Sequence, residues 1–311
     1  MDRNPINNFD ELLEQAIALR PKTVAVVYPN NDETFSAIIE ACVVMKAGFV
    51  LFGDEAVINR ALASAPGESM GRMRIVACGG VSQALAGAIE CVRTGEADIL
   101  MKGGIDTSTM MRAVLSEESG LRTGRLLSDI FVLEYPPRAD NQFIMITDGG
   151  MTLSPDLKNK VELINNAVEV AHALGNPIPR VAILSATEFV MPNLQSTIDA
   201  AALSKMNERG QIKGCVVDGP LALDNALSIE AAEEKGIKSE VAGRAQILVA
   251  ANIESANSLA KSTTYFANLR LAHVIVGAKA PILIPSRADK SDAKLLSIAL
   301  GSIVTDFLRG A

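Results

Sequence analysis

The chain has 311 residues, of which 49% are hydrophobic, and a formal net charge of −7 at pH 7. This length suits two ordinary domains, each with its own core. The negative charge argues against a nucleic-acid partner, because binding a phosphate backbone needs a basic surface. A small anion can still bind where a few Lys and Arg side chains converge, so we expect a small partner.

Two features of the sequence predict a cytoplasmic protein. No run of about 18 uncharged apolar residues occurs, so neither a membrane span nor a membrane partner is expected, and the polar, acidic start does not have the pattern of a signal peptide. The cysteines are Cys42, Cys78, Cys91 and Cys215. They lack C-x-x-C spacing and are predicted to be reduced core residues, not disulfide or zinc ligands.

Short apolar segments alternate with helical patterns along the chain. Helices are expected over 8–19, 32–46, 81–95, 157–174, 193–207, 254–268 and 290–309. Strands are expected over 23–28, 47–52, 74–78, 98–101, 143–147, 180–185, 214–218, 246–250, 273–277 and 281–284. Continuous apolar strands are typical of parallel sheets covered on both faces. The alternation predicts an α/β fold with open, doubly wound sheets.

Residues 120–142 break this alternation. The segment is strand-like in its middle and reaches Pro136-Pro137 and a polar turn, a pattern that suits a crossing between domains. We therefore predict a first α/β domain made of 1–130 plus 285–311 and a second made of 131–284. The return of the last segment to the first domain rests partly on the family resemblance described below.

In open α/β sheets, ligands bind beyond the carboxyl ends of the strands. The first loop of interest carries Lys102, Gly103, Gly104, Asp106, Thr107, Ser108 and Arg112. Its glycines would let the backbone approach a ligand, and the amides that open the next helix favour an anion. Lys102 and Arg112 could add positive charge. A tight turn with an ordinary helix cap from Asp106, Thr107 or Ser108 explains the same residues equally well.

Two further loops carry an aspartate followed by glycine. Asp148-Gly149-Gly150 follows an apolar strand, and Asp218-Gly219 follows another. Both could contact a substrate. Both also have the composition of simple turns.

The fourth loop lies near the end of the chain, where Ser286-Arg287 precedes a long amphipathic helix. A hydroxyl and helix amides can donate to an oxyanion, and a neighbouring arginine can bind phosphate through two hydrogen bonds. Asp289 and Asp292 supply carboxylates to the same loop. The alternative is a capped helix with acidic residues in its first turn, which the helix dipole favours.

A motif for another chemistry has weaker support. Residues 67–71 match the G-x-S-x-G pattern of a nucleophile elbow, but Pro66 leads in from a helical pattern and the motif needs a preceding strand. With only His172 and His273 as bases, both in regular patterns, the segment is predicted to be a loop. The sequence shows no nucleotide-binding glycine motif and no His/Cys cluster.

Five segments carry a resemblance when they are taken in order. They are ADILMKGGIDTSTMMRAVL, GLRTGRLLS, TDGGMTLSP, VVDGPLALDNALS and APILIPSRAD, spread from about residue 97 towards the end. Their order and spacing resemble the phosphate acetyl/butyryltransferase family, most closely its phosphate butyryltransferase branch. The N-terminal third agrees in pattern with less specific segments.

The resemblance implies an isocitrate/isopropylmalate dehydrogenase-like architecture of two α/β domains with an interdomain cleft. It implies an acyltransferase of fatty-acid metabolism that interconverts acyl-CoA plus phosphate with acyl phosphate plus coenzyme A. Coenzyme A would be a substrate, with no obligatory metal and no covalent acyl-enzyme. A homodimer or higher homo-oligomer is also implied.

Site residues are implied by the same resemblance. Ser286 matches a serine that binds the reacting carbonyl oxygen, Arg287 matches the arginine that binds phosphate, and Arg112 matches an arginine on the helix after the small-residue loop. The acetyl branch has an aspartate seven residues after that serine, where this chain has Ala293. Asp289 and Asp292 therefore both stay candidates for the base. The loop residues 102, 103, 107, 108, 148, 149 and 218 are expected to bind substrate.

Other functions remain open at this point. A decarboxylating dehydrogenase of related architecture would need NAD(P) and a divalent metal, and its activity would be sensitive to EDTA. A non-catalytic anion-binding protein would bind coenzyme A or phosphate without acyl transfer. Within the favoured class, butyryl is preferred over acetyl on the branch resemblance, although one methylene is worth only about 1–3 kcal/mol of discrimination.

Overall fold

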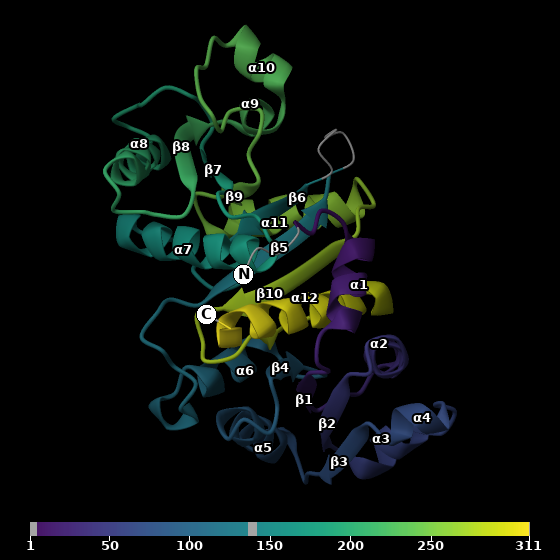
Figure 1. Ribbon diagram of the computed structural model, residues 1–311. Helices are drawn as coiled ribbons and strands as arrows, with labels where there is room; N and C mark the ends of the chain where they lie inside the picture. Colours follow the sequence, from purple (N-terminus) through teal and green to yellow (C-terminus); the bar gives the residue numbers. More distant parts are fainter. Residues whose placement is uncertain (1–4, 136–141, 311) are drawn as a thin grey trace. The chain divides into compact units, whose positions relative to one another are not determined.

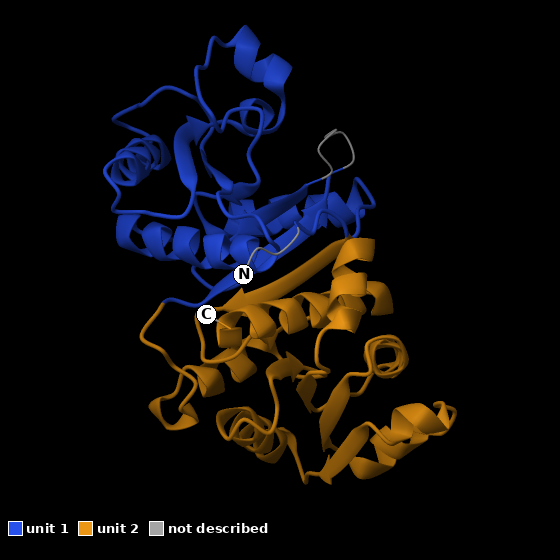
Figure 2. Cartoon of the chain, viewed as in Figure 1, with its two compact units in different colours: residues 1–8, 126–270 blue, residues 9–125, 271–311 orange. Residues whose placement is uncertain are grey.

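The computed structural model describes residues 5–135 and 142–310. The chain forms two compact units, coloured separately in Figure 2. Unit 1 contains residues 1–8 and 126–270, and unit 2 contains residues 9–125 and 271–311. The Pro136-Pro137 pair lies outside the described residues.

Unit 2 is built on a mainly parallel sheet. Its strands are β1 (Thr23–Val27), β2 (Gly48–Gly53), β3 (Met73–Ala77), β4 (Ile99–Lys102), β10 (Leu271–Val276) and β11 (Ile282–Leu283). They lie in the order β3-β2-β1-β4-β11-β10. The order reverses direction between β1 and β4, so the carboxyl ends of these two strands form a topological switch point, where α/β sheets bind ligands.

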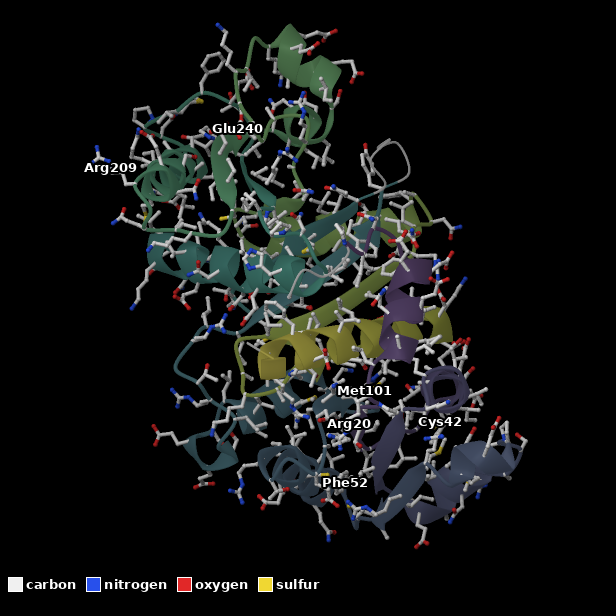
Figure 3. The ribbon with its side chains drawn as sticks, viewed as in Figure 1. Arg20, Cys42, Phe52, Met101, Arg209 and Glu240 are labelled. Atoms are coloured by element: carbon white, nitrogen blue, oxygen red, sulfur yellow. The ribbon has the colours of Figure 1, made fainter. Side chains whose placement is uncertain are left out.

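Helices cover this sheet (Figure 1). They are α1 (Phe9–Ala18), α2 (Asp32–Val44), α3 (Glu55–Leu62), α4 (Gly67–Met70), α5 (Val81–Arg93), α6 (Thr107–Val114), the 3₁₀ turn η1 (Glu117–Ser119) and α12 (Ser291–Gly310). Helix α12 packs against β10 and beside α1 and α2, whereas α5 packs against β1 and β2. Phe52, Met101 and Cys42, labelled in Figure 3, are buried side chains of this core.

Unit 1 is also built on β-strands that lie side by side. Its strands are β5 (Ser128–Glu134), β6 (Phe143–Thr147), β7 (Arg180–Leu184), β8 (Val216–Leu221) and β9 (Ile247–Val249), in the order β5-β6-β9-β7-β8. Its helices are α7 (Leu157–Ala173), α8 (Gln195–Glu208), α9 (Leu223–Leu227), α10 (Ile229–Glu234) and α11 (Ile253–Tyr265). Helix α7 packs against β5, β6 and β9, and α8 packs against β7 and β8.

The α/β fold class is confirmed, but not every strand pair is parallel. Strands β5 and β6 pair antiparallel, as do β10 and β11. The connection between β10 and β11 spans only residues 277–281. A parallel pair needs a crossover of about a dozen residues or more. A connection as short as this one can therefore join only antiparallel neighbours.

No helix within 5–135 and 142–310 is both long enough and apolar enough to cross a bilayer.

Candidate functional site

The candidate site in unit 2 lies where β1, β4 and β11 end side by side. Strand β4 pairs parallel with both β1 and β11. The three loops that follow these strands therefore emerge at one edge of the sheet. They contain residues 28–31, 103–106 and 284–290. The second and third loops include four of the predicted site residues, which are Gly103, Ser286, Arg287 and Asp289.

The two glycines after β4 are required by the packing of these loops. The Gly103 amide donates to the Val27 carbonyl at 2.9 Å, and the Gly104 amide donates to the Tyr28 carbonyl at 2.8 Å. A Cβ atom on Gly103 would overlap the Val27 carbonyl, and one on Gly104 would overlap the Asn30 side chain. Close approach to the backbone at Val27 explains Gly103, and close approach to the Asn30 side chain explains Gly104.

Lys102 is a buried cation at the end of β4. Its side chain is 4% exposed, and its ammonium donates one hydrogen bond, to the Ile105 carbonyl at 3.3 Å. Burial lowers the pKa of Lys102, and the charges of Arg287 and Lys294 lower it further, while Asp289 and Asp106 raise it. An ammonium has three donors. One long hydrogen bond leaves this buried charge poorly compensated, which suits a bound anion.

The segment after β11 forms a turn held by Asp289. The Ser286 amide donates to Asp289 Oδ2 at 2.7 Å, and the Asp289 amide donates back to the Ser286 carbonyl at 3.2 Å. The Ser286 hydroxyl oxygen accepts from the Ala288 amide at 3.3 Å. Asp289 is half-buried in this turn, whereas Asp292 is exposed in the first turn of α12.

Arg287 joins the third loop to the second. Its guanidinium lies 3.0 Å from Asp106 Oδ1, and the two side chains are 67% and 74% exposed. Asp106 occupies the N-cap position of α6 but makes no capping hydrogen bond with its side chain. The predicted cap therefore has a different role, because its carboxylate is paired with Arg287.

Helix α6 supplies the remaining predicted residues of unit 2. Thr107 and Ser108 lie in its first turn, and Arg112 lies near its end. Ser108 and Arg112 are exposed, and Thr107 is partly exposed. Of the predicted residues in unit 2, the structure therefore brings Lys102, Gly103, Ser286, Arg287 and Asp289 to one edge of the sheet.

Asp148 follows β6 in unit 1 and organises a turn. Its carboxylate accepts backbone hydrogen bonds from Asp129 at 3.0 Å, Gly150 at 3.1 Å, Met151 at 3.1 Å and Thr152 at 2.8 Å. Burial raises the pKa of Asp148 to about 6, the charge of Asp129 adds to this, and the backbone donors oppose it. Four backbone partners explain this aspartate as a turn-forming residue.

The glycine at position 149, next to Asp148, is explained by close packing. A Cβ atom there would lie 2.8 Å from the Phe131 ring, and the Gly149 carbonyl accepts from the Asn257 side chain at 2.9 Å.

Asp218 lies within β8 and not beyond it. The apolar pattern predicts a strand that ends at Asp218, but β8 continues to Leu221. Its register against β7 shifts between Ala182 and Leu184, so β8 contains an irregularity that extends the strand past Gly219. The Asp218 carboxylate accepts from the Gly219 amide at 2.8 Å.

Residues 72–301 match the family model described as phosphate acetyl/butaryl transferase. The chain belongs to this family.

Its relatives cover nearly the whole chain. The phosphate butyryltransferase of Clostridium beijerinckii is 43% identical over 297 residues, which are 96% of this chain and 97% of the relative. The probable phosphate butyryltransferase of Bacillus subtilis is 42% identical, over 93% of this chain and 95% of the relative. The phosphate acetyltransferase of Thermotoga maritima is also 42% identical, over 95% of this chain and 99% of the relative.

Solved structures of phosphotransacylases have the same fold as this chain. A branched-chain phosphotransacylase from Enterococcus faecalis V583 superposes with a TM-score of 0.80 at 28% identity, covering 91% of this chain and 99% of that chain. A phosphotransacetylase from Streptococcus pyogenes shares the fold, with a TM-score of 0.78 at 14% identity. The superposition covers 98% of this chain and 100% of that chain. The isocitrate/isopropylmalate dehydrogenase-like fold is thereby confirmed.

Four side chains outside this edge, those of Ser69, Cys42, Cys91 and Cys215, are poorly placed to act as nucleophiles. Ser69 of the G-x-S-x-G pattern lies in α4, which is a short helix and not the predicted loop, and its side chain is fully buried. Burial raises the pKa of Cys42 to about 12 and those of Cys91 and Cys215 to about 11. Thiols with raised pKa values are poor nucleophiles. The described residues contain no group of three or more His, Cys, Asp or Glu side chains able to hold a metal.

Two residues at this edge were missed by sequence reasoning. Lys294 of α12 is 1% exposed and its ammonium donates to the Asp289 carbonyl. Glu33 of α2 accepts from the Ser291 amide at 2.6 Å, so it caps α12 from another helix. The signal for Lys294 was its helical spacing from Ile298 and Gly301, which places it on a buried stripe. No local pattern indicates Glu33.

Proposed function

We propose that this transferase moves a short-chain acyl group between coenzyme A and inorganic phosphate, with butyryl favoured and acetyl as the alternative. The observation that carries the proposal is the meeting of Lys102, Ser286 and Arg287 at the switch point of unit 2, in a family whose relatives are named phosphate butyryl- and acetyltransferases. The relatives reported above are named as phosphate acyltransferases, which favours this reaction over that of a decarboxylating dehydrogenase.

We assign the phosphate to Lys102 and Arg287. The buried ammonium of Lys102 has donors to spare, and the exposed guanidinium of Arg287 can exchange its solvated pairing with Asp106 for a phosphate. Exposed ion pairs are worth only about 0–1 kcal/mol. A guanidinium–phosphate pair with two parallel hydrogen bonds is stronger, so the exchange is favourable.

Ser286 is assigned to the reacting carbonyl oxygen. In one direction a phosphate oxygen attacks the thioester carbon, the C–S bond breaks, and the coenzyme leaves as a thiolate that takes up a proton. In the other direction the thiol loses its proton, attacks the acyl phosphate carbon and releases phosphate. The Ser286 hydroxyl donates to the carbonyl oxygen as negative charge develops there, and one such donor is worth about 10²–10³ in rate.

The two candidate bases have different surroundings. Oδ2 of Asp289 already accepts the Ser286 amide, so we assign Asp289 to holding the turn. We assign Asp292, exposed at the start of α12, to accepting the thiol proton. A free thiol has a pKa near ~8.5, so a positioned carboxylate assists its ionisation as attack proceeds.

The other predicted residues are proposed to contact the substrates around this centre. They are Gly103, Thr107, Ser108 and Arg112 in unit 2 and Asp148, Gly149 and Asp218 in unit 1. We further propose a homodimer or higher homo-oligomer that acts in the cytoplasm, a compartment that suits its four unpaired cysteines.

The test is release of thiol from acetyl-, propionyl- and butyryl-CoA in the presence of phosphate, with trapping of the acyl phosphate by hydroxylamine. We expect phosphate-dependent thiol release that EDTA does not abolish, with butyryl-CoA giving the highest kcat/KM. Thiol release that does not depend on phosphate, or no hydroxamate product, would overturn the proposal. A higher kcat/KM for acetyl-CoA would leave the reaction standing and replace butyryl by acetyl.

A further inference from the structure

Lys294 is a lysine in a place that apolar residues normally fill. It lies one turn into α12, where every side chain from Lys294 to Thr305 is buried, and it is itself 1% exposed. Burying an ammonium costs several kcal/mol unless partners compensate it. Packing alone therefore does not explain a lysine at this position.

The side chain of Lys294 is hydrogen-bonded to the turn that carries Ser286 and Arg287. Its ammonium donates to the Asp289 carbonyl. Burial lowers the pKa of Lys294, and the negative charges of Asp289 and Glu33 oppose this effect. The charge of Lys294 also reaches Lys102 on β4. Lys294 therefore faces the turn, α2 and the end of β4 together.

Glu33 fixes the other end of the same turn. Its Oε2 accepts the Ser291 amide at 2.6 Å, while Asp289 Oδ2 accepts the Ser286 amide at 2.7 Å. The turn from Ser286 to Ser291 is thus tied at its start by Asp289, in its middle by Lys294 and at its end by Glu33. The first two ties are local in sequence, whereas the tie from Glu33 is long-range.

We propose that Lys294, together with Glu33, is a positioning residue for acyl transfer, because it braces the Ser286–Ser291 turn and neutralises Asp289. This inference rests on the proposed function. The brace keeps Ser286 and Arg287 in one arrangement between catalytic cycles. Neutralising Asp289 matters as well, because an uncompensated carboxylate there would compete with phosphate for the ammonium of Lys102.

Lys294→Met tests the brace by removing the charge while keeping a long side chain. We expect the KM for phosphate to rise about 10-fold or more and kcat to fall about 10- to 100-fold, since a misplacement of about 1 Å can cost 10²-fold in rate. Lys294→Arg keeps the charge and should recover part of the loss. A merely structural defect lowers the active fraction, so it would lower kcat and leave the KM for phosphate unchanged.

Lys22→Met is the matched control. Lys22 is also a buried lysine of unit 2, 7% exposed, but it lies at the amino end of β1 and pairs with Asp306 at 3.0 Å. Its loss should lower Tm and leave both KM values within about twofold of the wild type. Equal rises in the KM for phosphate in the Lys22 and Lys294 variants would overturn the proposal.

Hydrogen exchange of the peptide that covers 284–292 gives a readout independent of activity. In Lys294→Met and in Glu33→Gln, exchange of the Ser286 and Ser291 amides should be at least about 10-fold faster than in the wild type, with unchanged exchange in β1. Unchanged exchange in this peptide, or an unchanged KM for phosphate in Lys294→Met, refutes the brace. A wild type that makes no acyl phosphate refutes the proposed function instead, and the exchange result then decides the brace.

Discussion

Replacing Lys102 by methionine should have opposite effects on stability and on phosphate binding. Lys102 is 4% exposed and its ammonium makes one hydrogen bond of 3.3 Å. Its pKa is lowered by burial and by the charges of Arg287 and Lys294, which the carboxylates of Asp289 and Asp106 offset only in part. A charge so poorly compensated in the absence of substrate destabilises the fold, and it becomes useful only when an anion binds beside it.

The magnitudes follow from these surroundings. Exchanging buried ionic groups for apolar ones of similar volume is often neutral or stabilising by about 1–4 kcal/mol, so the Tm of Lys102→Met without phosphate should be higher by at least about 2 °C. A hydrogen bond to a charged group is worth about 1.5–3 kcal/mol. At about 1.36 kcal/mol per factor of ten, its loss should raise the KM for phosphate by about 10- to 150-fold.

The stability difference between the wild type and Lys102→Met should also depend on pH. Because burial lowers the pKa of Lys102, its destabilising effect is present at neutral pH and disappears as the pH rises towards the ordinary value of 10.5. The stability advantage of Lys102→Met should therefore shrink above neutral pH.

Scanning calorimetry with and without phosphate, together with steady-state kinetics, measures both effects. Phosphate should raise the Tm of the wild type by mass action and raise that of Lys102→Met much less. Lys102→Arg is the control that keeps the charge. A variant that melts lower than the wild type without phosphate and keeps its KM for phosphate would refute the reasoning, because Lys102 would then be an ordinary structural lysine.

Three further predictions concern other residues. Arg287→Ala should lose most activity and raise the KM for phosphate. Its free energy of unfolding should change by less than about 1 kcal/mol, because the exposed pairing of Arg287 with Asp106 contributes little to stability. Unchanged kinetics would remove Arg287 from the site. Asp292→Asn should lose kcat at neutral pH with little change in Tm, whereas Asp289→Asn should also lower Tm, and loss of kcat in neither variant would place the base elsewhere. The pKa of about 6 at Asp148 lies about two units above its ordinary value of 3.8, so the stability that its protonated form contributes is complete below about pH 4 and lost as the pH rises through 6. The difference in unfolding free energy between the wild type and Asp148→Asn, measured by urea denaturation, should therefore fall by about 3 kcal/mol from pH 4 to pH 7, and a constant difference would contradict the raised pKa.

Much of the local structure was determined by the sequence. The apolar pentamer at 143–147 is β6, and the helical pattern over 157–174 is α7. Periodicity is a property of neighbouring residues, so it can be read without knowing the fold. The ordered segments around Lys102 and Ser286-Arg287 likewise identified the family, and the family match over 72–301 confirms it.

The tertiary structure decided which of these residues meet. Arg287 pairs with Asp106, 181 residues away along the chain, because β4 and β11 are neighbours in the sheet. No local pattern contains that pairing. The tertiary structure also changed the interpretation of Asp106. The sequence predicts a helix cap there, but the Asp106 carboxylate pairs with Arg287.

The roles of Lys294 and Glu33 depend on tertiary structure for the same reason. A lysine in an amphipathic helix and a glutamate in a helix's first turn are ordinary in sequence. The packing of α12 beside α2 brings Glu33 to the turn that carries Ser286, and the burial of α12 turns the nearby Lys294 into a buried partner of that turn. Sequence patterns thus determine the secondary structure and the chemistry at hand, while burial and long-range hydrogen bonds determine which side chains form the site.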